Sequence, residues 1–411
     1  MSGVGGFDQG QFSGHPYGQY PPLQPAFDRP RRRGGVGFTI FVSAAMLLGA
    51  GVMALVLLGS GAGGGLVIAT VLAALPVAPL VACFMWLDRY EPEPRGLILS
   101  ALGWGALVAT AAALVLQTAN QFAFATPEPV EASIVAPITE EAAKGLFVVL
   151  LLLSRRHEID GILDGIVYAG MVGIGFAFTE NILYLAAAYM GGEDLGPGGI
   201  GAVTGTFVVR GIFSPFAHPF FTSAVGIGVG FAVVTRSRFW RVFAPILGYV
   251  VAVLGHALWN GTAFLAGGRL FLLGYVFVMV PAFFLLAAFA IWARKREGEM
   301  LVRALTDCAD RGFLGHWEVP WLARLPGRRA SRAWAKANGG PQALEAMSAY
   351  QQQATELGFL HDRYLRGTAP ADFAQRGQAM VNDLTALRPY VLFPQPPVGN
   401  YIAGPRSEGG R

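Results

Sequence analysis

Residues 37–60 read GFTIFVSAAMLLGAGVMALVLLGS, 24 residues without a single charged side chain. A helix needs about 20 apolar residues to cross the ~30 Å hydrocarbon layer of a bilayer, so this stretch predicts a transmembrane helix. The stretch is too long for the apolar core of a signal peptide, and no convincing cleavage site follows it. We therefore expect a membrane protein.

Seven more apolar stretches of similar length follow along the chain. They run approximately over residues 65–87, 96–118, 131–154, 164–189, 205–235, 242–266 and 270–293. The stretch 205–235 contains Arg210 and Pro215, which predicts a short interfacial helix followed by a span. The sequence therefore predicts an all-α fold, a polytopic membrane helical bundle of about eight transmembrane helices.

Charge is distributed unevenly along the 411 residues. Overall, 54% of the residues are hydrophobic and 14% are charged, whereas soluble domains carry about 25% charged residues, which disfavours a soluble enzyme or a disordered protein. Residues 37–294 hold 24 charged residues in 258 positions, and residues 295–411 hold 26 in 117. We predict a disordered Gly/Pro-rich cytoplasmic tail over 1–36, a transmembrane domain over 37–294, and a cytoplasmic, mainly helical C-terminal segment over 295–411.

Arginine and lysine mark one side of the membrane. The N-terminal tail and every second connection hold four, two, two, three and three of them, whereas the alternating connections hold none apart from Arg269. By the positive-inside rule, we expect a multi-pass protein of the cell membrane with both termini cytoplasmic. The basic side chains then face anionic lipid headgroups, so the net charge of +4 gives no reason to expect nucleic acid as a partner.

Several ionisable or polar side chains fall at a similar depth inside the apolar stretches. An ionisable side chain at mid-helix costs about 2.5–3.5 kcal/mol on insertion scales, so each is a candidate functional residue. The stretch 131–154 carries two glutamates about ten residues, or ~15 Å, below the predicted outer face. The full set in this layer is Glu140, Glu141, Lys144, Glu180, His218, His256 and Asn260.

Helical spacing suggests a chemistry for these groups. Glu140 and Glu141 lie four and three residues before Lys144, so one ammonium can partly neutralise both carboxylates. Two adjacent carboxylates in a low dielectric do not both ionise easily, so one of them could share a proton and act as a general base. His256 and Asn260 are again four apart, which puts an amide beside an imidazole, where it could donate to a developing oxyanion.

The remaining groups suggest a metal site. Glu180, His218 and His256 offer the oxygen and nitrogen ligands of a catalytic zinc and leave a fourth position for water. A structural role stays open for these charges, as a buried ion cluster on 131–154 and as a pair between Glu180 and Arg210. The sequence has no contiguous His-Glu-x-x-His motif, so it is compatible with zinc without requiring it.

Five short motifs resemble a known family. They are Asp88-Arg-Tyr-Glu-Pro-Glu-Pro94, Glu140-Glu-Ala-Ala-Lys144, Asp164-Gly-Ile-Val-Tyr168, Phe176-Ala-Phe-Thr-Glu180-Asn181 and His256-Ala-Leu-Trp-Asn260. Together they resemble the PrsW family of intramembrane proteases, which is similar to the CAAX prenyl endopeptidases and to bacteriocin-processing proteins. The resemblance covers roughly residues 65–265 and makes 37–294 the expected protease domain.

The resemblance implies an intramembrane (metallo)endopeptidase. A glutamate of the Glu140–Glu141 pair then activates the hydrolytic water, and Lys144 tunes the pair. The family is classed with metalloproteases, whereas related CAAX-type enzymes are described as glutamate-dependent without an essential metal, so both mechanisms stay open. The implied substrates are membrane-anchored proteins, such as an anti-sigma factor, cleaved near the extracytoplasmic side.

The resemblance also assigns the other motif residues. The second motif falls on Phe176 and Glu180, the third on His256 and Asn260, and the histidine of the intervening helix on His218. Asn260 stands where the family has Asp or Asn, and an amide suits an oxyanion donor better than a base. Glu180 and the two histidines would bind a metal or polarise the scissile carbonyl.

Two functions of other classes remain as alternatives. A proton-coupled transporter could use the carboxylates Glu140 and Glu141 as a relay, but it predicts two related halves with interrupted helices, and no such repeat is visible. A non-catalytic membrane scaffold would not need the intact glutamates and histidines. Because hydrolysis needs water, the protease hypothesis further predicts a polar cavity among the fourth to seventh spans.

Overall fold

A computed structural model describes residues 36–192, 196–264 and 269–394. Apart from Val36, the tail predicted over 1–36 lies outside them. The chain divides into two compact units, which are described separately. Among the described residues, one unit covers 36–299 with 363–368, and the other covers 300–362 with 369–394.

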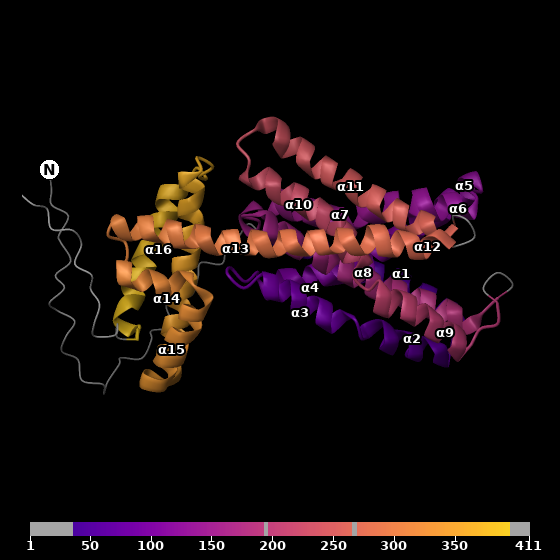
Figure 1. Cartoon of the computed structure of the whole chain (residues 1–411), viewed down its shortest axis with the longest axis horizontal. Helices are drawn as coiled ribbons and strands as arrows, with labels where there is room; N and C mark the ends of the chain where they lie inside the picture. Colours follow the sequence, from indigo (N-terminus) through magenta and orange to yellow (C-terminus); the bar gives the residue numbers. More distant parts are fainter. Residues whose placement is uncertain (1–35, 193–195, 265–268, 395–411) are drawn as a thin grey trace, which may run out of the picture. The chain divides into compact units, whose positions relative to one another are not determined.

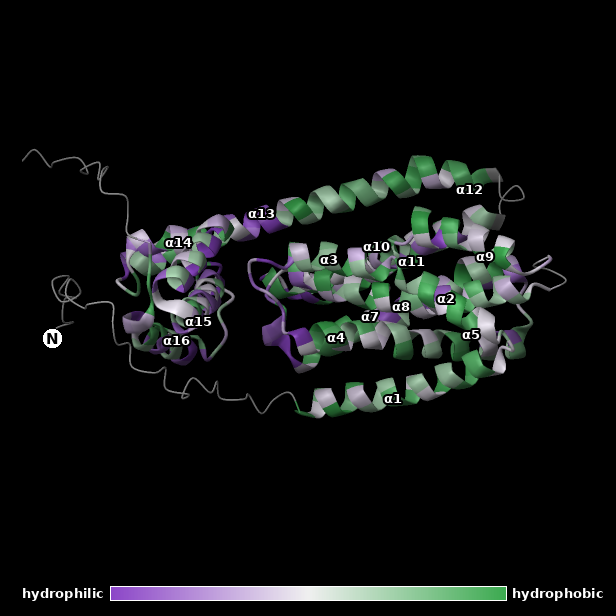
Figure 2. Ribbon diagram, turned by 90° about the horizontal axis from the view of Figure 1, so that it is seen from below, coloured by the Kyte–Doolittle hydropathy of each residue, from purple (hydrophilic) through white to green (hydrophobic). Residues whose placement is uncertain are grey.

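The first unit is a bundle of apolar helices (Figures 1 and 2). Within the described ranges, seven helices or runs of helices are long and apolar enough to cross a membrane. Two of them are the single helices α1 (Val36–Gly59) and α8 (Ile162–Met190), and another is the pair of α2 (Gly64–Ala74) with α3 (Val77–Leu87). A further run joins α4 (Arg95–Gly103), the π-helical η3 (Trp104–Ala109) and α5 (Thr110–Phe124).

The other three runs complete this set. They are α9 (Ile200–Phe207), η6 (Val208–Phe213) and α10 (Ala217–Val234); then α11 (Arg238–Phe264); then α12 (Arg269–Gly274), η8 (Tyr275–Met279) and α13 (Val280–Asp310). The remaining predicted stretch folds as the short α6 (Glu128–Val130), the π-helical η4 (Glu131–Val135) and α7 (Ala136–Ser154). α7 is not one of the seven apolar runs, because it contains three charged residues. The part of the chain that the structure describes contains no strand, and the predicted all-α membrane bundle is confirmed.

α8 forms the centre of this unit, because 89% of its most apolar window is buried. Two glycines allow its neighbours to approach. A Cβ on Gly165 would overlap the carbonyl oxygen of Gly226 on α10, and a Cβ on Gly175 would overlap that of Leu102 on α4. Such close backbone packing is typical of helices in membranes. α10 packs in turn against α11, so three neighbouring helices have fixed relative positions.

The interruption predicted from Pro215 is present. The helical run ends at Phe213, the N–H of the following Ser214 donates to the carbonyl of Val209, and α10 starts at Ala217. Proline has no N–H to continue the hydrogen-bond ladder, which explains a break at this point. The break places His218 in the first turn of α10, at the depth where α8 carries Glu180.

The second unit is also helical. It contains the C-terminal part of α13, then η9 (His316–Glu318), α14 (Val319–Ala323), most of α15 (Leu325–Leu365), α16 (Phe373–Leu387) and η10 (Arg388–Tyr390). α15 is kinked at Gly340, where φ is 69°, immediately before Pro341. Glu318 is fully buried there and accepts the Tyr350 hydroxyl at 2.6 Å while pairing with Arg388.

Candidate active site

Four helices bring six of the seven polar residues of the predicted layer into one connected cluster. The cluster consists of Glu140, Glu141 and Lys144 on α7, Glu180 on α8, His218 on α10 and His256 on α11. On α7, spacings of three and four residues turn both carboxylates toward the ammonium, as the sequence predicts. The cluster therefore depends on the packing of α8, α10 and α11 around α7.

Lys144 is the centre of the cluster, and its side chain is completely buried. Its Nζ lies 2.6 Å from Oε1 of Glu141 and 4.1 Å above the ring centroid of Phe176. Nζ also lies 3.1 Å from Nδ1 of His218. Because an ammonium group has only donors, Nδ1 of His218 accepts and the ring proton belongs on Nε2, which lies 2.6 Å from Oε2 of Glu180.

Glu141 is buried, and both of its oxygens are bonded. Oε1 faces Nδ1 of His256 at 3.0 Å as well as Lys144, and Oε2 accepts the hydroxyl of Thr222 at 2.9 Å. A carboxylate that holds one nitrogen of an imidazole fixes the ring orientation and its tautomer. Glu141 therefore aims Nε2 of His256 toward the interior of the cluster.

Glu140 differs from its neighbour in having a free oxygen. Its Oε1 accepts the amide of Gln117 at 3.3 Å. Its Oε2 is buried without a hydrogen bond, 3.5 Å from Nζ of Lys144 and 3.8 Å from Nε2 of His256. A buried carboxylate oxygen without a hydrogen-bond partner needs an explanation, such as a missing ion or water.

The donors around this oxygen fit a metal ion. Glu140, His218 and His256 each offer a ligand atom, and these atoms lie within 4.8 Å of one another. To bind a metal, His218 has to exchange one of its present partners, Lys144 at Nδ1 or Glu180 at Nε2. Two imidazoles and one carboxylate are a ligand set of catalytic zinc sites. The hydrogen bond between Glu141 and His256 adds the carboxylate partner that metal-bound histidines usually have.

Glu180 makes a different set of contacts from the one predicted for a ligand. It pairs with Arg210 and accepts from His218. Arg210 also donates through Nε to Oδ1 of Asn181 at 2.8 Å and stacks 3.9 Å above the ring of Tyr184. The pairing with Arg210 is the structural alternative that the sequence leaves open. The role of Glu180 as a metal ligand stays a prediction.

Asn260 lies outside the network that joins the cluster. Its Nδ2 donates to the main-chain carbonyl of Ala132 at 2.9 Å, which ties α11 to η4 just before α7. To serve as an oxyanion donor, as the motif predicts, the amide would have to exchange this partner. That role also stays a prediction.

Two residues that form hydrogen bonds with the cluster were not predicted from the sequence. Thr222 bonds Glu141, and Gln117 bonds Glu140. Thr222 follows His218 by four residues, so helical spacing gave a signal for it. Gln117 begins a short polar segment at the end of an apolar stretch, where polar residues are expected, so it gives no signal of its own.

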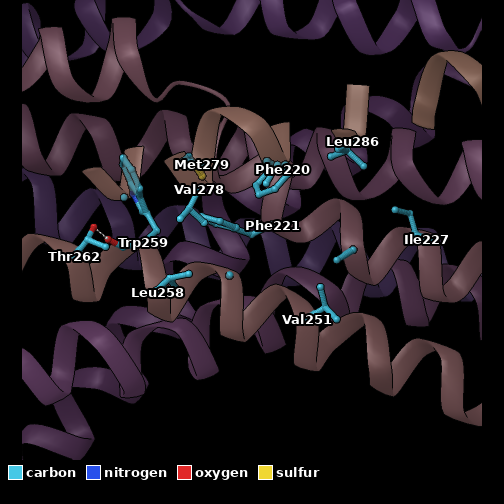
Figure 3. Close-up of a pocket in the computed structure, with 14 residues that line it drawn as sticks. Phe220, Phe221, Ile227, Val251, Leu258, Trp259, Thr262, Val278, Met279 and Leu286 are labelled. Carbon is cyan, nitrogen blue, oxygen red and sulfur yellow. Dashed lines mark hydrogen bonds between the residues drawn. The ribbon is translucent and has the colours of Figure 1, made fainter. Parts of the chain in front are cut away.

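A cavity does lie beside the cluster, but its lining is apolar (Figure 3). It opens against Phe221 and Gly255, next to His256. The water-filled polar cavity required by the protease hypothesis stays a prediction.

Comparison with known proteins identifies the class. A family model described as PrsW family intramembrane metalloprotease matches residues 93–286, which include every cluster residue. No solved structure matches the chain. Together with the helical bundle and its buried glutamates and histidines, the match defines an intramembrane endopeptidase.

Curated relatives identify the family more closely. Protease PrsW of Geobacillus kaustophilus is 30% identical over 172 residues, 41% of this chain and 70% of that protein. Protease PrsW of Oceanobacillus iheyensis is 25% identical over 225 residues, 54% of this chain and 94% of that protein. Protease PrsW of Clostridioides difficile is 28% identical over 117 residues, 27% of this chain and 49% of that protein. The chain belongs to the PrsW family of intramembrane metalloproteases, and neither a transporter nor a scaffold is favoured.

Proposed function

We propose that the chain hydrolyses a peptide bond of membrane-anchored proteins at the cluster of Glu140, His218 and His256. The observation that carries this proposal is the free oxygen of Glu140, which is buried beside Nε2 of His256. It is an acceptor with no hydrogen-bond partner in a protein interior, where such acceptors are rare. A water molecule or a metal ion would satisfy it.

Glu140, His218 and His256 would hold the metal, with zinc as the ion that this donor set suits best. A bound zinc ion supplies a Lewis acid and makes water a stronger nucleophile at neutral pH. Glu141 keeps His256 oriented through Nδ1. Lys144 compensates the buried charge of both glutamates.

Where no metal ion occupies Oε2, Glu140 is the glutamate that we assign to water activation. Its free Oε2 takes the proton as the water oxygen bonds to the scissile carbonyl carbon, and the proton passes to the amide nitrogen as the C–N bond breaks. Glu141 is less suited to this role because both of its oxygens are already bonded within the protein. Asn260 is the proposed donor to the oxyanion once its amide leaves the Ala132 carbonyl.

The place of cleavage follows from the proposed orientation. The basic connections are assigned to the cytoplasmic side, so the start of the helical run at Glu128 is extracytoplasmic, and Glu140 lies 12 residues after Glu128. The family resemblance suggests that the substrates are cleaved near that side. A single-span protein such as an anti-sigma factor is the substrate that the family resemblance suggests.

The experiment uses the purified full chain in proteoliposomes with a single-span substrate. Wild type should cleave it, and Glu140→Gln should lower the rate by about 10²–10⁴-fold, the contribution of a positioned acid–base group. Glu131→Gln is the matched control, because Glu131 also has a buried oxygen without a hydrogen bond but lies outside the cluster. Equal cleavage by Glu140→Gln and wild type would contradict the proposal.

The metal is tested separately. Elemental analysis of the purified protein should find about one metal ion per chain, lost in His218→Ala and His256→Ala. A chelator should abolish cleavage, and zinc should restore it. Full activity of a metal-free chain would leave Glu140 as a base and rule out the metal-dependent form.

A further inference from the structure

The apolar cavity beside the cluster has a volume of about 270 Å³ and lies between α10, α11 and the run from α12 to α13 (Figure 3). Its lining includes Phe221 and Ala224 on α10, Trp259 on α11, and Val278 and Ala282 on the last run. Thr262 adds a hydroxyl, but that hydroxyl donates to the carbonyl of Trp259 at 2.7 Å. The lining therefore selects apolar groups.

The cavity shares a wall with the catalytic cluster. The ring of Phe221 stacks on the imidazole of His256, with ring centroids 5.0 Å apart and an angle of 11° between the planes. Gly255, the residue before His256, lies in the lining as well. A group that fills the cavity therefore lies directly beside the site where the scissile bond must be held.

The outer wall of the cavity is weakly packed. In the run Leu270–Asp310, only 6% of the most apolar window is buried. The rings of Phe216 and Phe283 hold this run at a centroid distance of 4.2 Å, and the hydroxyl of Tyr275 donates to the carbonyl of Phe213 at 2.8 Å. Segments with few buried contacts open at low free-energy cost, so a substrate within the bilayer could enter at this wall.

The wall also contains a π-helical segment. η8 (Tyr275–Met279) supplies Val278 and Met279 to the lining. Short π-helical insertions are rare and occur frequently at functional sites. This places irregular backbone at the boundary between the bilayer and the cavity, beside the cluster.

Resting on the proposed function, we propose that this cavity is a specificity pocket that binds one large apolar side chain of the substrate, preferably aromatic, next to the scissile bond. An apolar cavity of about 150 Å³ is large enough for benzene, so this one accepts an aromatic ring with room to spare. It is too small for a whole helix, whose diameter is about 10–12 Å. Because lipid tails are as apolar as the lining, shape rather than burial from water would give the selectivity.

The test compares two single-span substrates that differ only in having Phe or Ala at a residue flanking the mapped cleavage site. Wild type should prefer the Phe substrate by about 10–200-fold in kcat/KM, the range over which an apolar pocket discriminates. Ala282→Phe fills the pocket from α13, on the opposite side from His256. It should bring the preference close to one while the Ala substrate is still cleaved.

Ala288→Phe is the matched control, because it adds the same ring to an exposed position of the same helix. It should leave both rates unchanged. Val278→Ala enlarges the pocket instead, and should raise the rate for a Trp substrate relative to the Phe substrate. This opposite shift keeps the test decisive if Ala282→Phe fails to fold.

Three outcomes would overturn the inference. A wild-type enzyme without a preference at any flanking position would do so. Equal losses for both substrates in Ala282→Phe, with the ratio unchanged, would point to a lipid chain in the cavity. Changes in Ala288→Phe equal to those in Ala282→Phe would show a nonspecific effect. Failure of the proposed function is distinct, because cleavage would then be absent or insensitive to Glu140→Gln.

Discussion

Two adjacent glutamates on α7 differ in what surrounds them. Glu141 is the partner of Lys144, His256 and Thr222, whereas Glu140 keeps one oxygen free. Removing one partner of a buried ion pair leaves an uncompensated charge and typically costs about 3–5 kcal/mol. We therefore expect Glu141→Ala to lower the thermal stability in detergent as well as the activity.

Glu140→Gln provides the contrast for this prediction. It removes a charge that makes only a 3.5 Å approach to Lys144, and it keeps the acceptor for Gln117. Its melting temperature should stay close to that of wild type while the cleavage rate collapses. If both variants lost stability to the same extent, the distinction between a positioning and a reacting glutamate would be wrong.

Arg210 is the second residue on which the site depends without belonging to the reacting atoms. It pairs with Glu180, which in turn accepts from His218. Loss of such an outer partner typically costs 10–100-fold in activity. We expect a drop of about that size in kcat/KM for Arg210→Met and a smaller drop for Arg210→Lys. Arg238→Met, at an exposed position of α11, should cleave like wild type.

The sequence predicts which residues share a depth but not which way each helix is rotated. The cluster could be predicted from polar side chains in apolar stretches. Burying a charge in lipid costs so much free energy that every such residue is a candidate functional residue. Hydropathy says nothing about whether Glu140 or Glu180 faces His256. That depends on the contact of α8 with Arg210 on η6, which joins residues far apart in sequence.

At the scale of elements, the packing of α8 on α10 fixes the positions of Glu180 and His218. Gly165 faces Gly226 so closely that a methyl group would overlap its carbonyl oxygen. We expect Gly165→Ala to cost about 1–3 kcal/mol through overpacking and to lower activity. Gly51→Ala on α1, where an added Cβ meets nothing within 4 Å, is the control and should leave thermal stability and cleavage unchanged.

The connection between α3 and α4 is held by buried acids. Oδ2 of Asp88 accepts the N–H of Glu93 at 2.8 Å, and Glu93 accepts the hydroxyl of Tyr168 at 2.6 Å. Burial raises the pKa of Asp88 from 3.8 to about 8, against the lowering effect of the Glu93 N–H, and the charge of Asp164 adds to the rise. The Asp88 carboxyl is therefore largely protonated at neutral pH.

Because the pKa of Asp88 is raised in the folded state, the contribution of its protonated carboxyl to the stability of this connection is complete below about pH 4. That contribution is lost as the pH rises through 8. We expect the hydrogen-exchange protection factors of residues 88–94 to fall between pH 6 and pH 9. Asp88→Asn keeps an acceptor for the Glu93 N–H but cannot titrate, so its protection should be flat over the same range. A parallel fall in both proteins would place the titration elsewhere.

Spans, their approximate limits and the break at Ser214 follow from apolar length and from Pro215, because these depend on local chemistry. The π-helical segments η3, η4, η6 and η8 do not. An extra residue in a helical turn leaves the hydrophobic pattern nearly unchanged, and its cause lies in packing between helices. Two of them adjoin the cluster or its neighbouring cavity, η6 through Arg210 and η8 through Val278, and η4 accepts the Asn260 amide through Ala132.

For the whole molecule, the remaining question is which side of the membrane the cluster is nearer. The distribution of Arg and Lys predicts cytoplasmic termini, an extracytoplasmic connection at 125–127 and a cytoplasmic one at 235–237. Full-length chains with a fluorescent protein at either terminus should therefore be bright. Alkaline phosphatase inserted at 125–127 should be active, and at 235–237 inactive.

The outcome also determines the direction from which water and substrate reach the site. Glu140 follows residue 127 by 13 residues and precedes Ser154 by 14, if α6, η4 and α7 are followed along the chain. Its position along this run is therefore close to the middle. Active phosphatase at 235–237 would show that the bundle has the opposite orientation in the membrane. Cleavage would then release substrate fragments toward the cytoplasm, and the chemistry of the cluster would be unchanged.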